Sequence, residues 1–295
     1  MKTTQIVMHI MPYEIDDYYY IIQRLYKSME NDQTKYYISL NTTLNLSPCL
    51  IDWDNSELSK QFFIDKFIDI QSKIHGFYEI KYDIILDDSI LGTTAQKRNA
   101  IRHKYDQYIF LDSDIAFPCA LLDYMLYVGD NLDGKYIITP QLVKMWDPSW
   151  DILVNDRFKH KEYGYQYIHD PELTYNQTIN NVYTTQSPYF KFGCGWFTLY
   201  SYDILDFIGI PEWLGPYGPE DTFIMFASQY AIQKNYDITQ YIINGMYISE
   251  NYIKNNNIYK DKLSLINLKD KFRLEAENKF DEKLREFYNN LTYNI

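Results

Sequence analysis

Short apolar runs alternate with amphipathic stretches along the first 140 residues of the chain. Runs rich in β-forming residues, each short enough to be a buried strand, lie at 5–11, 36–41, 84–86, 108–111 and 136–139. The stretches between them, predicted to be helices, are 13–30, 56–74, 92–104 and 118–128. This alternation predicts an α/β fold: a doubly wound, mostly parallel central sheet with helices on both faces.

Beyond Pro140 the pattern loosens. Residues 141–190 show little periodicity, which indicates an irregular lobe or a long functional insertion. A further strand is predicted at 192–200, followed by a short helix at 203–208. A Gly/Pro-rich loop then precedes a helix that runs from Glu220 to about residue 230. The charged tail at 265–291 has apolar residues at helical spacing and is predicted to be a C-terminal helix.

Composition excludes several classes of protein. With 46% hydrophobic and 23% charged residues, the chain can bury a large core, which excludes a disordered protein. A net charge of −12 argues against a general nucleic-acid backbone binder, because such binding needs clustered Lys and Arg. The three cysteines are widely spaced and indicate neither a disulfide framework nor a zinc site.

The chain shows neither a signal peptide nor a transmembrane segment, so a cytoplasmic location is expected. Its 31 tyrosines, with many Ile and Asn, fit the coding bias of an AT-rich genome such as that of a virus, phage or microbe. In the viral case the location would be the host cytoplasm. The same bias weakens single tyrosines as functional signals.

The clearest chemical signal is the apolar run 108–111, which ends in Asp112-Ser113-Asp114. The carboxyl edge of a parallel sheet is where ligands bind in α/β folds. Two carboxylates on a short tether there suit Mg²⁺ or Mn²⁺ carrying a diphosphate. The alternative is a solvated turn, since Asp-Ser-Asp is also good turn chemistry.

A second carboxylate pair, Glu220-Asp221, follows the loop Gly215-Pro216-Tyr217-Gly218-Pro219. Acidic residues at a helix start complement the helix dipole, so capping is one interpretation. The other is catalytic, because a carboxylate on a glycine-containing loop can act as a general base over an acceptor.

In order and spacing, these motifs resemble the GT-A glycosyltransferases, especially the family-2 type, over residues 5–230. Five segments carry the resemblance: Met11-Pro12, Gly92-Thr93-Thr94-Ala95-Gln96-Lys97-Arg98-Asn99-Ala100-Ile101, Asp112-Ser113-Asp114, Phe192-Gly193-Cys194-Gly195-Trp196 and Gly218-Pro219-Glu220-Asp221-Thr222. The resemblance implies a GT-A (Rossmann-like) fold in one domain spanning 1–295. Within it, 1–140 would bind a nucleotide sugar, 141–240 would hold the acceptor and catalytic half, and 241–295 would be a C-terminal extension.

The resemblance also implies a donor site. Asp112 and Asp114 would serve Mn²⁺ or Mg²⁺ on the donor diphosphate, with Asp114 as direct ligand and Asp112 contacting ribose or the metal through water. Arg98 would lie near the diphosphate or brace the Asp-X-Asp strand. Met11 and Ser113 adjoin these motifs and belong to the expected nucleotide-sugar contacts.

Two positions depart from the family pattern. Asn41, expected to end the second strand, stands where the family often has a base-contacting aspartate, which leaves the nucleotide open. Many relatives supply a later histidine to the metal, but no histidine follows His169, so Glu250 is the stand-in candidate.

On the acceptor side, the resemblance implies that Asp221 deprotonates an acceptor hydroxyl, with Glu220 orienting it or sharing the task. In-line attack would then invert the anomeric centre. Trp146, Trp150 and Trp196 are candidate sugar platforms, and core packing is the equally weighted alternative for each.

The expected function is a metal-dependent glycosyltransferase that moves a sugar from a nucleotide-sugar donor to a saccharide or glycoconjugate. A modified DNA base is a less favoured acceptor. A nucleotidyltransferase of similar fold is one alternative, although the first strand leads into Met11-Pro12 and not into a glycine-rich, basic phosphate loop. A catalytically silent carbohydrate-binding protein is another, disfavoured because clustered acids at a cleft cost stability without a function.

Overall fold

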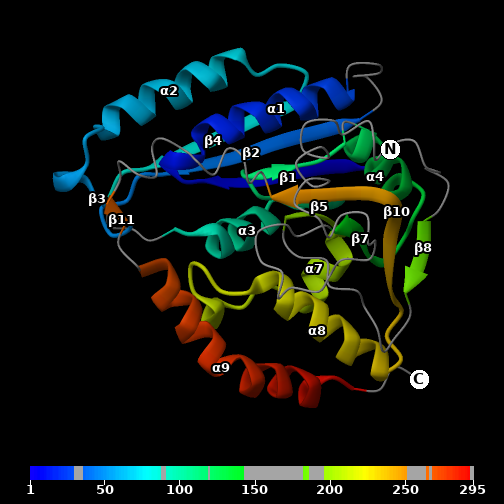
Figure 1. Ribbon diagram of the computed structural model, residues 1–295. Coiled ribbons are helices and arrows are strands. Elements are labelled where there is room, and N and C mark those ends of the chain that lie inside the picture. The colour runs from blue at the N-terminus through cyan, green and yellow to red at the C-terminus, as the bar shows by residue number, and fades with distance from the viewer. Residues whose placement is uncertain are drawn as a thin grey trace.

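The computed structural model describes residues 1–29, 36–87, 91–118, 120–142, 182–185, 196–250, 264–265 and 268–292. Figure 1 shows its helices and strands. The strands are β1 (Thr3–Ile10), β2 (Tyr37–Asn45), β3 (Ile51–Asp52), β4 (Glu79–Ile85), β5 (Gln107–Leu111), β6 (Ile115–Ala116), β7 (Lys135–Leu142), β8 (Val182–Thr185), β9 (Phe197–Ser201), β10 (Ile238–Glu250) and β11 (Ser264–Leu265). The helices are α1 (Ile15–Met29), α2 (Lys60–Lys73), α3 (Thr93–Ile101), α4 (Ala120–Asp130), α7 (Tyr202–Ile208), α8 (Glu220–Gln233) and α9 (Leu268–Asn290), with short 3-10 turns η1 (Pro12–Glu14), η3 (Trp53–Asn55) and η5 (Glu212–Leu214).

The central sheet has the strand order β4-β2-β1-β5-β9-β7-β10-β6, with β8 beside β10. Strands β4, β2, β1 and β5 are parallel. Strand β9 is antiparallel to both β5 and β7, so β7 and its parallel partner β10 run in the same direction as β1. The predicted mostly parallel α/β sheet is therefore confirmed. Strands β3 and β11 form a separate two-stranded ladder.

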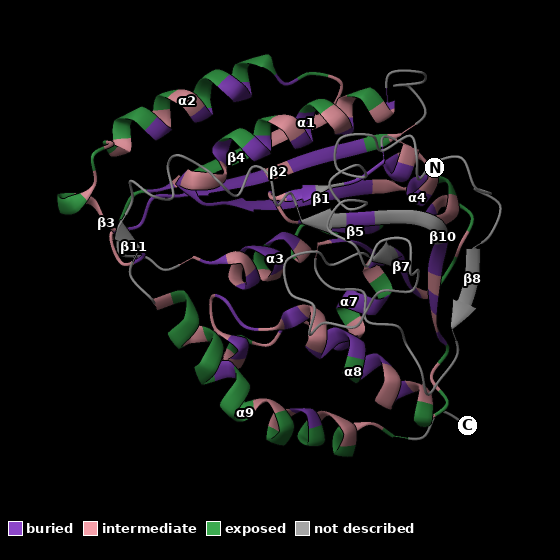
Figure 2. Ribbon diagram, viewed as in Figure 1, coloured by how far each residue is buried: buried purple, intermediate pink, exposed green. Residues whose placement is uncertain are grey.

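Helices cover both faces of this sheet, as predicted. Helices α1, α2 and α4 pack on one face, whereas α3, α7, α8 and α9 pack on the other (Figure 1). Along β1 the side chains alternate between the two cores: Ile6 and Met8 face the first, and Val7 faces the second. The central strands β1, β5 and β9 are accordingly buried, whereas the edge strand β4 is largely half-buried or exposed (Figure 2). Each fully buried large aliphatic side chain contributes about 1.5–3 kcal/mol to stability.

The chain order creates a switch point in the sheet between β1 and β5. From β1 the chain moves outward through β2 to β4, then returns to place β5 on the other side of β1. Crossover connections therefore leave β1 and β5 in opposite directions, and the carboxyl ends of strands at such a switch point are where open α/β sheets bind ligands. The Asp112-Ser113-Asp114 segment follows β5 directly at this place.

Some predicted boundaries are wrong for identifiable reasons. Strand β2 continues past Asn41 to Asn45, because polar residues in its second half are buried and hydrogen-bonded inside the sheet. Helix α2 begins at Lys60 and not at residue 56, because the Ser59 hydroxyl caps it by accepting from the N–H of Phe62.

Strand β10, which was not predicted, crosses the expected boundary at residue 240, and the expected boundary at residue 140 lies inside β7. Both boundaries thus fall within strands of one sheet, where β7 and β10 pair with each other. The predicted C-terminal helix is present as α9. Among the described helices, none combines the length and the apolar character that crossing a membrane requires.

Candidate active site

The carboxyl ends of β1 and β5 are joined through Glu14. The turn η1 directs the Glu14 side chain back toward both strands, so that its Oε2 accepts from the N–H of Met11 and from the hydroxyl of Ser113, each at 2.8 Å. Met11 and Ser113 are buried. Burial raises the pKa of the Glu14 carboxyl, and the charge of Lys269 opposes that rise. Direct contact of Met11 and Ser113 with a nucleotide sugar stays a prediction.

Asp112, one of the two carboxylates predicted to hold a metal, has a strongly raised pKa. Its N–H donates to the carbonyl of Trp196 at 3.0 Å, which places the backbone of Trp196 beside the motif. Burial raises the pKa of Asp112 to about 7; the ammonium of Lys97 opposes the rise, while the carboxylates of Asp114 and Glu220 add to it. The ionised form is therefore costly here without a further cation.

The donor set fits a divalent cation that keeps other ligands. Within the described residues, no three His, Cys, Asp or Glu side chains converge as a metal-binding group. Mg²⁺ is commonly held by one or two carboxylates together with water and substrate phosphates, and Asp112 and Asp114 supply such oxygens. The backbone of Glu250 pairs with Ile115, next to Asp114 in the chain. Its expected role as a metal ligand stays a prediction.

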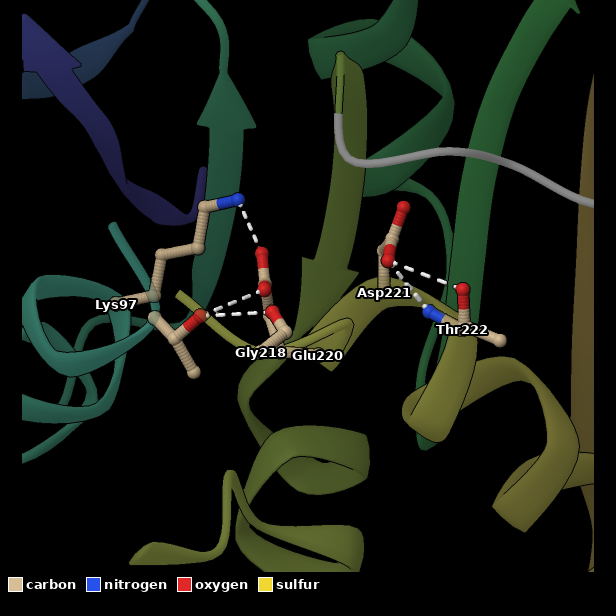
Figure 3. Close-up of polar contacts among 6 residues, drawn as sticks. Lys97, Gly218, Glu220, Asp221 and Thr222 are labelled. Carbon is tan, nitrogen blue, oxygen red and sulfur yellow. Dashed lines mark hydrogen bonds and ion pairs between the residues drawn. The ribbon is translucent and has the colours of Figure 1, made fainter. Parts of the chain in front are cut away.

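The segment 209–219, which joins α7 to α8, is called the acceptor loop below. Glu220, the acid that follows it as the first residue of α8, is held by a buried ion pair with α3 (Figure 3). Oε1 of Glu220 lies 2.5 Å from Nζ of Lys97, and both side chains are more than nine-tenths buried. The Thr94 hydroxyl lies 3.0 Å from Oε2 of Glu220 and 2.9 Å from the carbonyl of Gly218. Burial disfavours the Lys97 ammonium, but the carboxylates of Glu220 and Asp112 outweigh this effect and raise its pKa. Lys97 therefore stays charged.

Asp221 lies apart from this ion pair. Its Oδ1 accepts from the N–H of Thr222 at 2.6 Å, and Figure 3 shows its side chain separated from those of Lys97 and Glu220. Consecutive side chains on a helix diverge by about 100°. Its charge nevertheless contributes to the raised pKa of Lys97, so Asp221 and Asp112 lie around one ammonium.

Helix α3 also holds the rest of the acceptor loop. The N–H of Thr94 donates to the carbonyl of Pro216, and a Cβ on Gly92 would lie 2.3 Å from the same oxygen, so only glycine permits this approach. Arg98 donates through Nε to the carbonyl of Ile210 and through Nη2 to that of Pro211, each at 2.7 Å. Arg98 thus braces the loop, and its expected contact with a donor diphosphate stays a prediction.

A buried polar network links the loop to β1 and β2. Nδ2 of Asn45 donates to the hydroxyl of Tyr217 at 3.1 Å and to the carbonyl of Leu91 at 2.9 Å. Nε2 of His9 lies 3.3 Å from the same hydroxyl. Burial, together with the charge of Lys269, lowers the pKa of His9 to about 3, so the imidazole is neutral. The residue at the carboxyl end of β2 is therefore Asn45, which corrects the placement of Asn41 there.

Of the three tryptophans predicted to contact the acceptor, only Trp196 lies within the described residues. Trp196 is half-buried beside Asp112 and packs against the apolar core. Trp146 and Trp150 lie outside the described residues. The sequence interpretation missed five residues that the fold brings to this region: Glu14, Thr94, Lys97, Tyr217 and Lys269. Thr94 and Lys97 fall in a family motif and Tyr217 in the acceptor loop, whereas nothing in the pattern singles out Glu14 or Lys269.

Comparisons with known proteins find similar solved structures but no matching family model or curated protein. Solved structures similar to it include GalNAc-T7 with UDP, GalNAc and Mn²⁺ (TM-score 0.46, 10% identity, covering 85% of this chain and 44% of that one). Others are glucosyl-3-phosphoglycerate synthase of M. tuberculosis (0.43, 10%, 84% and 71%) and S. aureus TarS 1–349 with UDP (0.46, 13%, 84% and 60%). The chain thus spans less than half of the GalNAc-T7 chain.

Proposed function

We propose that the protein is a metal-dependent glycosyltransferase of the GT-A, family-2 type, which uses a nucleotide-sugar donor and inverts the anomeric centre. One observation carries the proposal: two acidic motifs more than a hundred positions apart meet around a single buried lysine at the switch point of the sheet. Asp112 belongs to the motif after β5, and Glu220 and Asp221 begin α8 directly after the acceptor loop. A cation site and a base site side by side are what sugar transfer from a diphosphate requires.

Each acid has a distinct part in the proposed reaction. Asp112 and Asp114 hold Mn²⁺ or Mg²⁺, which when bound offsets the charge that builds on the departing diphosphate. Asp221 accepts the proton of the acceptor hydroxyl as its oxygen attacks the anomeric carbon. The separate direction of the Glu220 side chain, toward Lys97, supports the choice of Asp221 as base. The acceptor class stays a saccharide or glycoconjugate.

The end of β1 disfavours the nucleotidyltransferase alternative. A phosphate-binding loop there would offer backbone N–H groups and a basic side chain to the ligand. In this chain the turn η1 instead directs the carboxylate of Glu14 inward, and the N–H of Met11 is already bonded to it. Phosphate would meet a carboxyl group at this point and not a set of free N–H donors. The acids of the switch point therefore suit a cation better than they suit a bare phosphate.

Calorimetry with a panel of nucleoside diphosphates and nucleotide sugars tests the proposal. Wild-type protein in MnCl₂ should bind at least one nucleoside diphosphate and its sugar, and EDTA should abolish that binding. Asp114→Asn should fold, because the side chain is only half-buried, and should lose the Mn²⁺-dependent binding. Equal nucleotide binding with Mn²⁺ and with EDTA would remove the metal from the mechanism. Absence of binding across the panel would overturn the function itself.

A further inference from the structure

Lys269 stands at the candidate site although it comes from the far end of the chain. It is the second residue of α9, a helix anchored elsewhere by aromatic packing such as that of Phe280 on Trp213 and Phe223. In Figure 1, α9 passes beneath α8, and the two helices are in contact. Nζ of Lys269 lies 5.6 Å from the centroid of the Tyr217 ring. Through Tyr217 the lysine thus adjoins the network that joins the acceptor loop to β1 and β2.

The charge of Lys269 acts on the groups at the switch point. It lowers the pKa of His9 and opposes the burial that raises the pKa values of Glu14 and Asp112. His9 and Glu14 flank the end of β1, and Asp112 follows β5. An exposed ammonium therefore lies close enough to the carboxyl ends of β1 and β5 for its charge to act on both. Charge interactions of this kind act over several ångströms and fade within about 10 Å at physiological salt.

The position of Lys269 is not explained by the stability of its helix. Other cations of α9 pair with acids at helical spacing: Lys271 with Glu275, and Arg273 with Glu277. The residue four positions after Lys269 is Arg273, a like charge that slightly destabilises the helix. Among the described residues, Lys269 has no ion-pair partner, and its side chain is exposed.

Two other cations near the switch point, Lys97 and Arg98, already have partners. Lys97 is buried against Glu220 at 2.5 Å, and the guanidinium of Arg98 donates to the carbonyls of the acceptor loop. Neither can turn toward a ligand without giving up those contacts. Lys269, in contrast to these two, has an exposed ammonium that can meet an incoming anion.

We propose that Lys269 binds the diphosphate of the donor and carries part of the negative charge of the leaving group. This inference rests on the proposed function. In the transfer step, the acceptor oxygen forms a bond to the anomeric carbon and gives its proton to Asp221. The bond from that carbon to the diphosphate oxygen breaks, and its electron pair stays on the diphosphate. The ammonium of Lys269 stabilises that added charge as a point charge on a flexible stem.

Binding of nucleoside diphosphates by matched lysine variants tests this role. Lys269→Met removes the charge, and Lys271→Met is the control, since it removes an exposed charge two positions along the same helix. For the nucleoside diphosphate that wild type binds most tightly in MnCl₂, Lys269→Met should weaken binding by about tenfold, as loss of one charged contact does. Lys271→Met should leave it unchanged. Affinity for the corresponding nucleoside, which has no phosphate, should be the same in all three proteins.

The outcomes separate this inference from the proposed function. If wild type binds a nucleoside diphosphate and Lys269→Met binds it equally well, the role of Lys269 is wrong and the glycosyltransferase proposal stands. An equal loss in Lys271→Met, or a parallel loss of nucleoside binding, would also overturn it, because a contact with the diphosphate predicts neither. If wild type binds none of the panel, both proposals fall together. Unchanged thermal unfolding of the variants without nucleotide checks that the fold is intact.

Discussion

Removing the ammonium of Lys97 should destabilise the protein more than removing any surface charge. In Lys97→Met the buried carboxyl group of Glu220 loses the ammonium that lies 2.5 Å away in wild type. The hydroxyl of Thr94 remains as one hydrogen-bond donor to it. Breaking one side of a buried ion pair costs about 3–5 kcal/mol, because the remaining charge is desolvated without compensation. We expect a loss of that size in the free energy of unfolding.

A second substitution should restore most of this loss. Replacing both partners by apolar residues of similar volume is often neutral, because no charge is then left buried. In Lys97→Met/Glu220→Met, Thr94 can still donate to the carbonyl of Gly218 at 2.9 Å. The loss of Lys97 also leaves the half-buried carboxylate of Asp112 less compensated, so recovery should be incomplete. We expect the double variant to lie within about 2 kcal/mol of wild type.

Urea unfolding at pH 7.5, monitored by tryptophan fluorescence, measures these differences for wild type, Lys97→Met, Glu220→Met and the double variant. The double variant should be clearly more stable than Lys97→Met alone, which gives a large coupling energy between the two positions. Two outcomes would refute the reasoning: losses that simply add, or a single variant as stable as wild type. Either would mean that the pair contributes no more than an exposed salt bridge, whose worth is about 0–1 kcal/mol.

Two further predictions concern Asp112 and Asp221. The pKa of Asp112 is raised from 3.8 to about 7 in the folded protein, so the folded protein binds that proton more tightly than the unfolded chain does. In the absence of metal, the free energy of unfolding should therefore fall as pH rises from about 4 to 7. Asp112→Asn should remove this pH dependence and raise the free energy of unfolding at pH 8 by up to about 4 kcal/mol. If the free energy of unfolding of wild type and of Asp112→Asn changed equally between pH 5 and pH 8 in EDTA, the prediction would be wrong. Asp221→Asn should lower kcat for nucleotide-sugar hydrolysis by about 10²–10⁴ while donor binding persists, with Glu220→Gln milder. NMR of the product should show inverted configuration, and retention would exclude this base.

The fold class was readable from the sequence because the relevant signals are local. Buried parallel strands are short apolar runs, and the helices between them carry apolar residues at a period of 3.6. The Asp112-Ser113-Asp114 segment could be placed at the sheet edge by the same logic, since it follows β5 without interruption. Strand β10 lacked such a signal, because Asn244 and Gly245 interrupt its apolar pattern. Its pairing with β7 was therefore not visible before the fold was known.

Residues that act through distant partners could not be predicted. Lys97 lies on a short helix, and its partner Glu220 is separated from it by 123 positions, so no periodicity connects them. The end of β2 was misplaced for a related reason. Asn41, Thr42 and Thr43 look like turn residues, but Thr42 is buried within hydrogen-bond reach of Gln71 and Tyr18. Polar side chains that find partners inside the fold cannot be distinguished from loop residues by composition.

The segment from Gly92 to Arg98 gains a physical explanation from the structure. Its glycine admits the carbonyl of Pro216, Lys97 holds Glu220, and Arg98 binds the carbonyls that open the same loop. One helix of nine residues thus positions the acceptor loop against the strand that carries Asp112. The spacing of this motif is set by helix geometry, since residues three or four apart share a face. The segment therefore serves the proposed chemistry by positioning Glu220 and Asp221 relative to Asp112 and Asp114.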